Sequence, residues 1–197
     1  STPVQTTNPA IGLAAGNYTV TVTDQKGCFT TRDTTVLEPD ALLIASMDMD
    51  SASCNGVADG TATAIGITGG NGTNGFSWNS TPVQTTNPAI GLAAGNYTVT
   101  VTDQKGCFTT RDTTVLEPDA LLIASMDMDS ASCNGVADGT ATAIGITGGN
   151  GTNGFSWNST PAQTTNPAIG LAAGNYTVTV TDQKGCFTTR DTTVLEP

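Results

Sequence analysis

The chain has 197 residues, a formal net charge of −11, no histidine and only six lysines and arginines. This acidic balance disfavours nucleic acid, whose phosphates proteins neutralise with lysine and arginine, and it disfavours adsorption to anionic lipid. The longest apolar run, Ala41–Ala45, falls far short of the roughly 20 residues that span a bilayer. The sequence therefore predicts no nucleic-acid partner and no direct insertion into a membrane.

A repeat of 79 residues organises the chain. The same segment begins three times at this spacing, at Ser1, Ser80 and Ser159. Over all overlapping positions the copies differ at one place only, which is occupied by Val4, Val83 and Ala162. Self-similarity at a fixed period indicates a tandem array of one structural unit.

The segment Leu116–Asp119 offers the best boundary between units. Pro118 cannot donate a hydrogen bond to a β-ladder, and it restricts the backbone of the residue before it. We therefore expect residues 1–39 to be the C-terminal half of a truncated module. Residues 40–118 and 119–197 are expected to be two complete modules.

The predicted elements of a module are strands, because Thr, Val and Ile alternate over short runs that Gly, Asn, Asp and Pro interrupt. The first strand of a module is expected at 121–128 in the last copy, and the later ones at 61–67, 76–78, 97–102 and about 107–116 of the middle copy. In the strand at 97–102, Tyr97, Val99 and Val101 share one face, which is typical of a half-buried antiparallel strand. Trp78 is the expected core anchor.

With some six or seven strands in 79 residues, a module has the strand density of an immunoglobulin-like sandwich. The predicted fold class is therefore all-β, with tandem immunoglobulin-like antiparallel β-sandwich modules in a linear array. A domain this small buries a modest fraction of its surface, so an additional covalent crosslink would be useful.

The five cysteines occur in two contexts, Gly-Cys-Phe and Ser-Cys-Asn-Gly, once each per repeat. Without histidine or a closely spaced thiol pair, metal binding and nucleophilic catalysis by these thiols are unsupported. No Ser/His/Asp constellation can form either, so we expect no enzyme. Structural disulfides in an exported protein are the favoured interpretation.

Two sets of disulfides fit the spacing. Cys54 could pair with Cys107 and Cys133 with Cys186, within modules, or Cys28 with Cys54 and Cys107 with Cys133. We favour the first set, because closing a loop of about 50 residues would stabilise a small sandwich by roughly 4 kcal/mol in the entropic model. Cys28 would then be unpaired because its module is truncated.

Several motifs resemble one family. They are Ser-Cys-Asn-Gly-Val-Ala-Asp-Gly-Thr, Gly-Gly-Asn-Gly, Phe-Ser-Trp-Asn, Gly-Leu-Ala-Ala-Gly-Asn-Tyr-Thr-Val-Thr-Val-Thr-Asp and Lys-Gly-Cys. Together they resemble the SprB repeats of surface adhesins from gliding Bacteroidota, over essentially the whole period. Members often have Pro-Tyr-x-Tyr-x-Trp where this chain has Asn74–Trp78. The resemblance implies a very large protein that is exported by type IX secretion, displayed on the outer membrane and active in adhesion and gliding motility.

Two weaker patterns suggest sites. Asp127 and Asp129 lie about 7 Å apart on one strand face, with Asp138 on a nearby loop, so the three could bind calcium weakly. The alternative is a strand whose outer charges discourage edge pairing. Thr113 and Ser130 each follow an aspartate, which resembles the O-glycan attachment sites of exported Bacteroidota proteins. Apart from calcium, no cofactor is expected.

The leading functional hypothesis is structural. The repeats would form the shaft of a long extracellular, outer-membrane-anchored adhesin, with neighbouring repeats as their partners. An external surface or polysaccharide would be bound by a tip outside these residues. The alternative is a multivalent module in which every repeat binds carbohydrate or another surface weakly. Exposed aromatic side chains would be its signature, and Phe76, Trp78 and Tyr97 are expected in the core.

Overall fold

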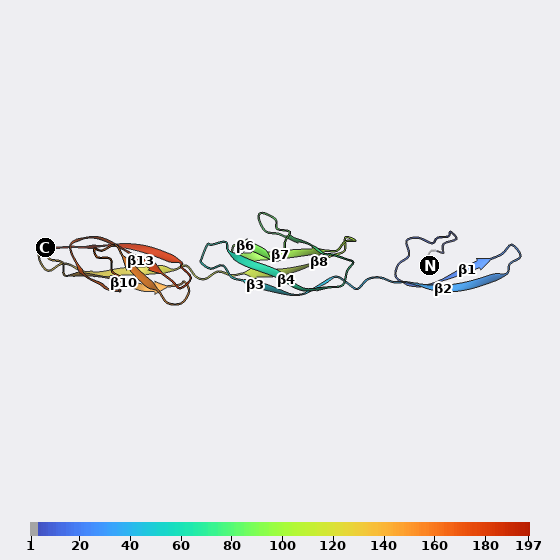
Figure 1. Ribbon diagram of the computed structural model, residues 1–197, viewed down its shortest axis with the longest axis horizontal. Helices are drawn as coiled ribbons and strands as arrows, with labels where there is room; N and C mark the ends of the chain where they lie inside the picture. Colours follow the sequence, from blue (N-terminus) through green and yellow to red (C-terminus); the bar gives the residue numbers. More distant parts are fainter. Residues whose placement is uncertain (1–3) are drawn as a thin grey trace.

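The structure, a computed structural model, describes residues 4–197, which form fourteen strands and no helix. Figure 1 shows three bodies in a row along the longest axis: a hairpin near the N-terminus and two sandwiches. The hairpin consists of β1 (Gly16–Thr23) and β2 (Phe29–Val36). Within residues 4–197, no helix is long and apolar enough to cross a membrane.

Each sandwich contains six strands in two three-stranded antiparallel sheets. The first sandwich consists of β3 (Leu43–Asp50), β4 (Gly60–Thr68), β5 (Gly75–Trp78), β6 (Ala89–Leu92), β7 (Gly95–Thr102) and β8 (Phe108–Val115). The second consists of β9 (Leu122–Asp129), β10 (Gly139–Thr147), β11 (Gly154–Trp157), β12 (Ala168–Leu171), β13 (Gly174–Thr181) and β14 (Phe187–Val194). The strands of the sandwiches fall within residues 40–118 and 119–197.

In the first sandwich one sheet has the order β3-β4-β6 and the other β5-β7-β8, and the second sandwich repeats this topology. In the first sandwich, β5 and β8 therefore flank β7, as strands C and G flank strand F in an immunoglobulin fold. Trp78 lies on β5, the counterpart of strand C, which carries the buried Trp of that fold. The Tyr97 hydroxyl donates to the carbonyl oxygen of Ala93 at 3.0 Å, which is the corner contact of that fold. The predicted all-β, immunoglobulin-like tandem array is confirmed.

The core lies between the two sheets. Trp78, Val99 and Val101 project from one sheet and are fully buried. The facing sheet contributes small residues, Ala62 and Ala89, which leave room for the indole. The indole N–H donates to the carbonyl oxygen of Thr86 at 2.9 Å, so its polar atom is satisfied. Trp78 is therefore the core anchor that the sequence predicted, with Phe76 and Tyr97 packed against the same cluster.

Arg111 closes one side of the sandwich. Its guanidinium, on β8, donates to the carbonyl oxygens of Ile44 and Ala45 on β3, which is the outer strand of the other sheet. These carbonyls would otherwise form an open sheet edge, so the contact both ties the sheets together and protects the edge. Arg190 makes the same contacts with Ile123 and Ala124 in the second sandwich.

The N-terminal hairpin has the same sequence as β7–β8 but no sheet packed against it. Val99 is 0% exposed in the sandwich, whereas its counterpart Val20 is 56% exposed in the hairpin. The register of the hairpin is nevertheless the same, since Val20 lies opposite Arg32 as Val99 lies opposite Arg111. Local sequence therefore fixes the pairing, and only the missing sheet differs.

This difference gives a matched pair of substitutions. We expect Val99→Ala to lower the free energy of unfolding of the first sandwich by about 2 kcal/mol, because it removes buried methyl groups and leaves a cavity. Val20→Ala should change it by less than about 0.5 kcal/mol, as at other exposed positions. Denaturant unfolding followed by tryptophan fluorescence measures both, and equal effects would contradict the structure.

Candidate functional site

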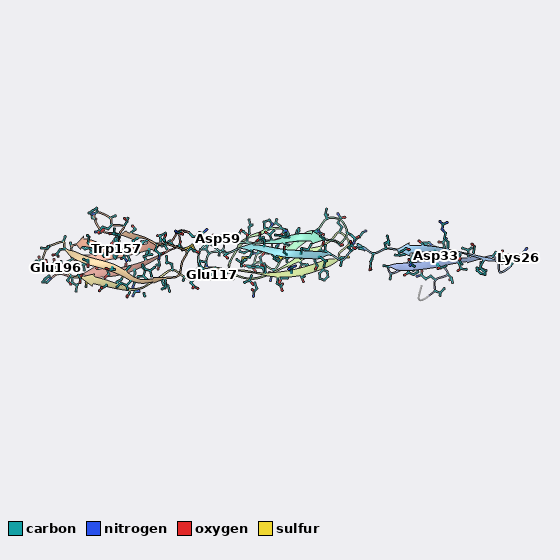
Figure 2. All side chains as sticks on the ribbon, turned by 90° about the horizontal axis from the view of Figure 1, so that it is seen from below. Lys26, Asp33, Asp59, Glu117, Trp157 and Glu196 are labelled. Atoms are coloured by element: carbon teal, nitrogen blue, oxygen red, sulfur yellow. A yellow bond between two sulfur atoms is a disulfide. The ribbon has the colours of Figure 1, made fainter. Side chains whose placement is uncertain are left out.

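The junction between the two sandwiches is the candidate functional site. A disulfide joins Cys54 of the first module to Cys186 of the second, with 5.6 Å between their Cα atoms and a sequence separation of 132. The peptide linker around Pro118 crosses the same junction. Figure 2 shows Asp59 and Glu117 beside it, whereas Glu196, the counterpart of Glu117, lies at the far end of the second sandwich.

The expected pairs Cys54–Cys107 and Cys133–Cys186 are wrong, as is the alternative set Cys28–Cys54 and Cys107–Cys133. In the first module, Cys54 follows the end of β3, whereas Cys107 follows the β7–β8 turn, which packs beside the start of β3. An eight-residue strand separates these positions by roughly 25 Å. A disulfide requires Cα atoms within about 7 Å, so a module cannot bridge its own cysteines.

The loop that carries Cys54 is anchored to the last residues of its own module. The Glu117 carboxylate accepts hydrogen bonds from the Asn55 side chain at 3.1 Å and from the Gly56 backbone N–H at 2.6 Å. The Asn55 amide also donates to the Pro118 carbonyl oxygen, at 3.1 Å. The loop therefore presents Cys54 at the C-terminal end of the sandwich.

A serine–aspartate contact fixes the residue beside this cysteine. The hydroxyl and the backbone N–H of Ser53 both donate to the carboxylate of Asp59. These two hydrogen bonds, the hydroxyl first, hold the pKa of Asp59 below its ordinary value. The carboxylate is thus charged at neutral pH, when it is the better acceptor.

On the other side of the junction, Asp182 organises the turn that carries Cys186. One carboxylate oxygen accepts from the backbone N–H groups of Lys184 and Cys186, at 2.8 and 2.9 Å. The other accepts from the backbone and the side chain of Asn150, at 2.6 and 3.1 Å. Burial alone would raise the pKa of Asp182, but these hydrogen bonds outweigh it and the pKa lies below its ordinary value.

Asn150 also reaches across the junction. Its side-chain amide donates to the Ser53 carbonyl oxygen of the preceding module at 3.0 Å. On the same side, a Cβ on Gly148 would lie 2.1 Å from the Ala120 carbonyl oxygen, so the linker packs directly on this glycine. The Gly-Gly-Asn-Gly motif therefore accommodates the linker and supplies the cross-junction contact.

Other copies of the same residues show what the junction buries. Cys54, Cys186 and Pro118 are half-buried, whereas Cys133 and Cys107, which occupy equivalent positions without a partner module, are exposed. The linker residue Pro39 is also exposed, although residues 37–42 have the same sequence as 116–121. The burial therefore comes from the contact between modules rather than from the local sequence.

The structure does not bring Asp127, Asp129 and Asp138 together as a calcium site. Among residues 4–197, no group of three or more acidic or cysteine side chains is arranged to hold a metal. The Asp138 carboxylate is occupied by the Ser132 hydroxyl and backbone N–H, and Asp129 accepts from Thr140. Each carboxylate therefore has a protein donor of its own.

The two candidate glycosylation residues differ in accessibility. Ser130 is exposed just beyond β9, whereas Thr113 is half-buried on β8, opposite Tyr97. O-glycosylation at these residues stays a prediction. One aromatic residue of each repeat is exposed, namely Phe29, Phe108 and Phe187. Phe187 lines a shallow hollow at the junction together with Cys54 and Val57.

No family model matches the chain. No curated protein sequence matches it either. Among solved structures, it is similar to a chain described as "Crystal structure of Dpr11 IG1 bound to DIP-gamma IG+IG2", with 11% sequence identity and a TM-score of 0.31. The similarity covers 77% of this chain and 98% of that one.

Sequence reasoning located both cysteine motifs but missed the residues that position them. Glu117 lies in the predicted boundary segment, and Asn55, Asn150 and Asp182 lie in motifs that served only for the family resemblance. One usable signal was the Asp-Gln-Lys-Gly-Cys segment, because an aspartate side chain that accepts from the following backbone N–H groups is a common turn device. The Glu117 contact joins residues about 60 positions apart, which no local pattern reveals.

The lowered pKa of Asp182 predicts a pH dependence. A carboxyl whose pKa is lower in the folded state contributes stability above its unfolded-state pKa and loses it as pH falls through the folded-state pKa. The ordinary value is 3.8. We therefore expect Asp182→Asn to lower the melting temperature at pH 7, and the difference from the unsubstituted chain to shrink below pH 3.8.

Asp24→Asn is the control, because Asp24 makes the same turn contacts in the hairpin, where no sandwich depends on them. It should leave the melting of the sandwiches unchanged at every pH. Thermal melts at several pH values would contradict the assignment if the effect of Asp182→Asn were the same at pH 7 and at pH 3.

Proposed function

We propose that these repeats form the shaft of a long extracellular bacterial surface adhesin, and that their contribution is reach and stiffness. The observation that carries the proposal is the junction, where the disulfide and the Pro118 linker connect successive sandwiches at two points. Two connections restrict bending and twisting far more than a single linker does. The end-to-end order of the bodies in Figure 1 is the order that a shaft requires.

The cellular setting belongs to the same proposal. Disulfides form and persist mainly in oxidising compartments, which supports an exported protein. The motifs that resemble SprB repeats suggest type IX secretion, outer-membrane anchoring and a part in gliding motility. The acidic composition keeps a long polymer soluble and its copies apart. In this proposal the chain has no catalytic role.

Small-angle scattering on chains of two, four and eight complete copies tests the shaft. An eight-residue strand spans roughly 26 Å, so with its loops each copy should add about 35 Å to the maximum dimension. We expect nearly linear growth with copy number, because each junction is fixed. Growth close to the square root of copy number would indicate a flexible chain and contradict the proposal.

Removal of the junction cysteines is the matched control. Cys→Ser at every position equivalent to Cys54 should leave the circular dichroism and tryptophan fluorescence of the sandwiches unchanged, since Trp78 and Trp157 lie in separate cores. The maximum dimension should then grow less steeply with copy number. If it grows just as steeply, the disulfide is not what stiffens the array.

The exposed phenylalanines favour a second candidate function. Phe29, Phe108 and Phe187 are each about 70% exposed, and an array would present one such ring per repeat. Repeated weak contacts could add up to useful avidity on a polysaccharide or a surface. For this rival function, binding to glass or polysaccharide should strengthen with copy number and be lost when all the equivalent phenylalanines are changed to alanine. For a pure shaft, no binding should be measurable for the chain with phenylalanine or for the chain with alanine at these positions.

A further inference from the structure

We propose that the Cys54–Cys186 junction is one instance of a repeating joint. The C-terminal end of each complete module is a half-site that binds the N-terminal end of the module following it in the chain, and a disulfide closes the joint. The partner is thus a second copy of the same module. The inference deepens the proposed shaft and rests on it for its biological meaning, while its chemistry is tested separately.

The C-terminal half-site is also formed in the second module, where the structure describes no module packed against it. In the second module, the Glu196 carboxylate accepts from the Asn134 side chain at 3.2 Å and from the Gly135 backbone N–H at 2.9 Å. Ser132 donates to Asp138 just as Ser53 donates to Asp59. The loop is therefore held in the conformation of the occupied joint, with the Cys133 thiol free and exposed.

The N-terminal half-site is likewise formed without a partner. In the first module, Asp103 accepts from the backbone N–H groups of Lys105 and Cys107 and from Asn71, as Asp182 does in the occupied joint. Asp103 is buried, so this arrangement is fixed by the module itself. Cys107 is free and exposed at the position that Cys186 occupies in the second module.

The register of the observed disulfide accounts for all three free cysteines. Cys54, a Ser-Cys-Asn-Gly cysteine, pairs with the Gly-Cys-Phe cysteine 132 positions later, and a repeating joint extends this register to every copy. In this register the partners of Cys28 and Cys107 fall before residue 1, and the partner of Cys133 falls after residue 197. The free thiols are thus those whose partner position lies outside these residues, which is what a repeating joint predicts.

The closing step is a thiol–disulfide exchange. The two cysteines lose two protons and two electrons as the S–S bond forms, and a disulfide oxidant is reduced to two thiols. Oxidised glutathione serves as this oxidant in the test below. The half-sites bring the two sulfurs together, so the oxidant is needed only to accept the two electrons.

The test compares the 197-residue chain with the same chain extended at its C-terminus by a copy of residues 40–118, both folded in a glutathione buffer. We expect three free thiols in each, because the added copy brings two cysteines and allows one further disulfide. The new bond should join Cys133 to the Gly-Cys-Phe cysteine of the added copy. Cys133→Ser in the extended chain should raise the count to four.

The natural Val/Ala difference makes the bond traceable. Trypsin releases Cys133 in a peptide that contains Ala162, whereas the peptides of Cys54 and of the added loop contain valine at that place. The Ala162 peptide should be alkylated in the 197-residue chain and disulfide-linked in the extended one. An alkylated Ala162 peptide in the extended chain, or five free thiols, would overturn the repeating joint. One free thiol in the 197-residue chain would show two disulfides among its five cysteines and overturn the register itself.

Failure of this inference is distinguishable from failure of the shaft. The thiol count and the peptide linkage depend only on which cysteines meet, whereas the shaft is judged by scattering. An array could have a disulfide at every joint and still bind surfaces through its phenylalanines. It could also be stiff without the disulfides, held by contacts such as that between Asn150 and Ser53.

Discussion

Cys54 and Cys186 can meet because each repeat carries its two cysteines at opposite ends of one sandwich. β3 runs the length of the module, with the Cys54 loop beyond one end and the β7–β8 turn of Cys107 beside the other. This separation forbids a bond within the module and leaves the neighbouring module as the only partner within reach along the array. Both the linear order and the two-point connection at the junction follow from it.

A comparison of the three copies separates what the local sequence determines, such as strand pairing, from what tertiary contacts determine, such as burial. The hairpin β1–β2 has the register of β7–β8 without a facing sheet, so pairing is encoded in the alternating Thr and Val residues and in the Asp-x-x-Gly turn. Burial of the valines needs the second sheet. In the same way, the linker at 37–42 is identical in sequence to that at 116–121, but only the second follows a complete sandwich, whose Asn55 loop holds Glu117 and Pro118. The second module holds Glu196 in the same way, so this anchoring belongs to the complete module.

Most strands were predictable because alternation is a local property, and the predicted strand at 97–102 lies inside β7. β6 was missed, since four residues with a glycine among them carry little periodicity. The disulfide was mispredicted for a different reason. Loop closure concerns only the entropy of the unfolded chain, in which both pairings are open, whereas the distance between strand ends in the folded module decides which cysteines can meet. The calcium site failed likewise, because strand spacing cannot show that Asp138 already has Ser132 as its donor.

The energetics of the joint are largely independent of those of the modules. The two cores share no residue, and each is completed by its own tryptophan and its own Arg-capped edge. The junction is instead made of end loops, whose anchors, Glu117 and Asp182, bind within their own modules first. Opening the disulfide therefore need not unfold a sandwich, because the anchors that shape each half-site remain. The joint can therefore form or open without a change in the fold of either module.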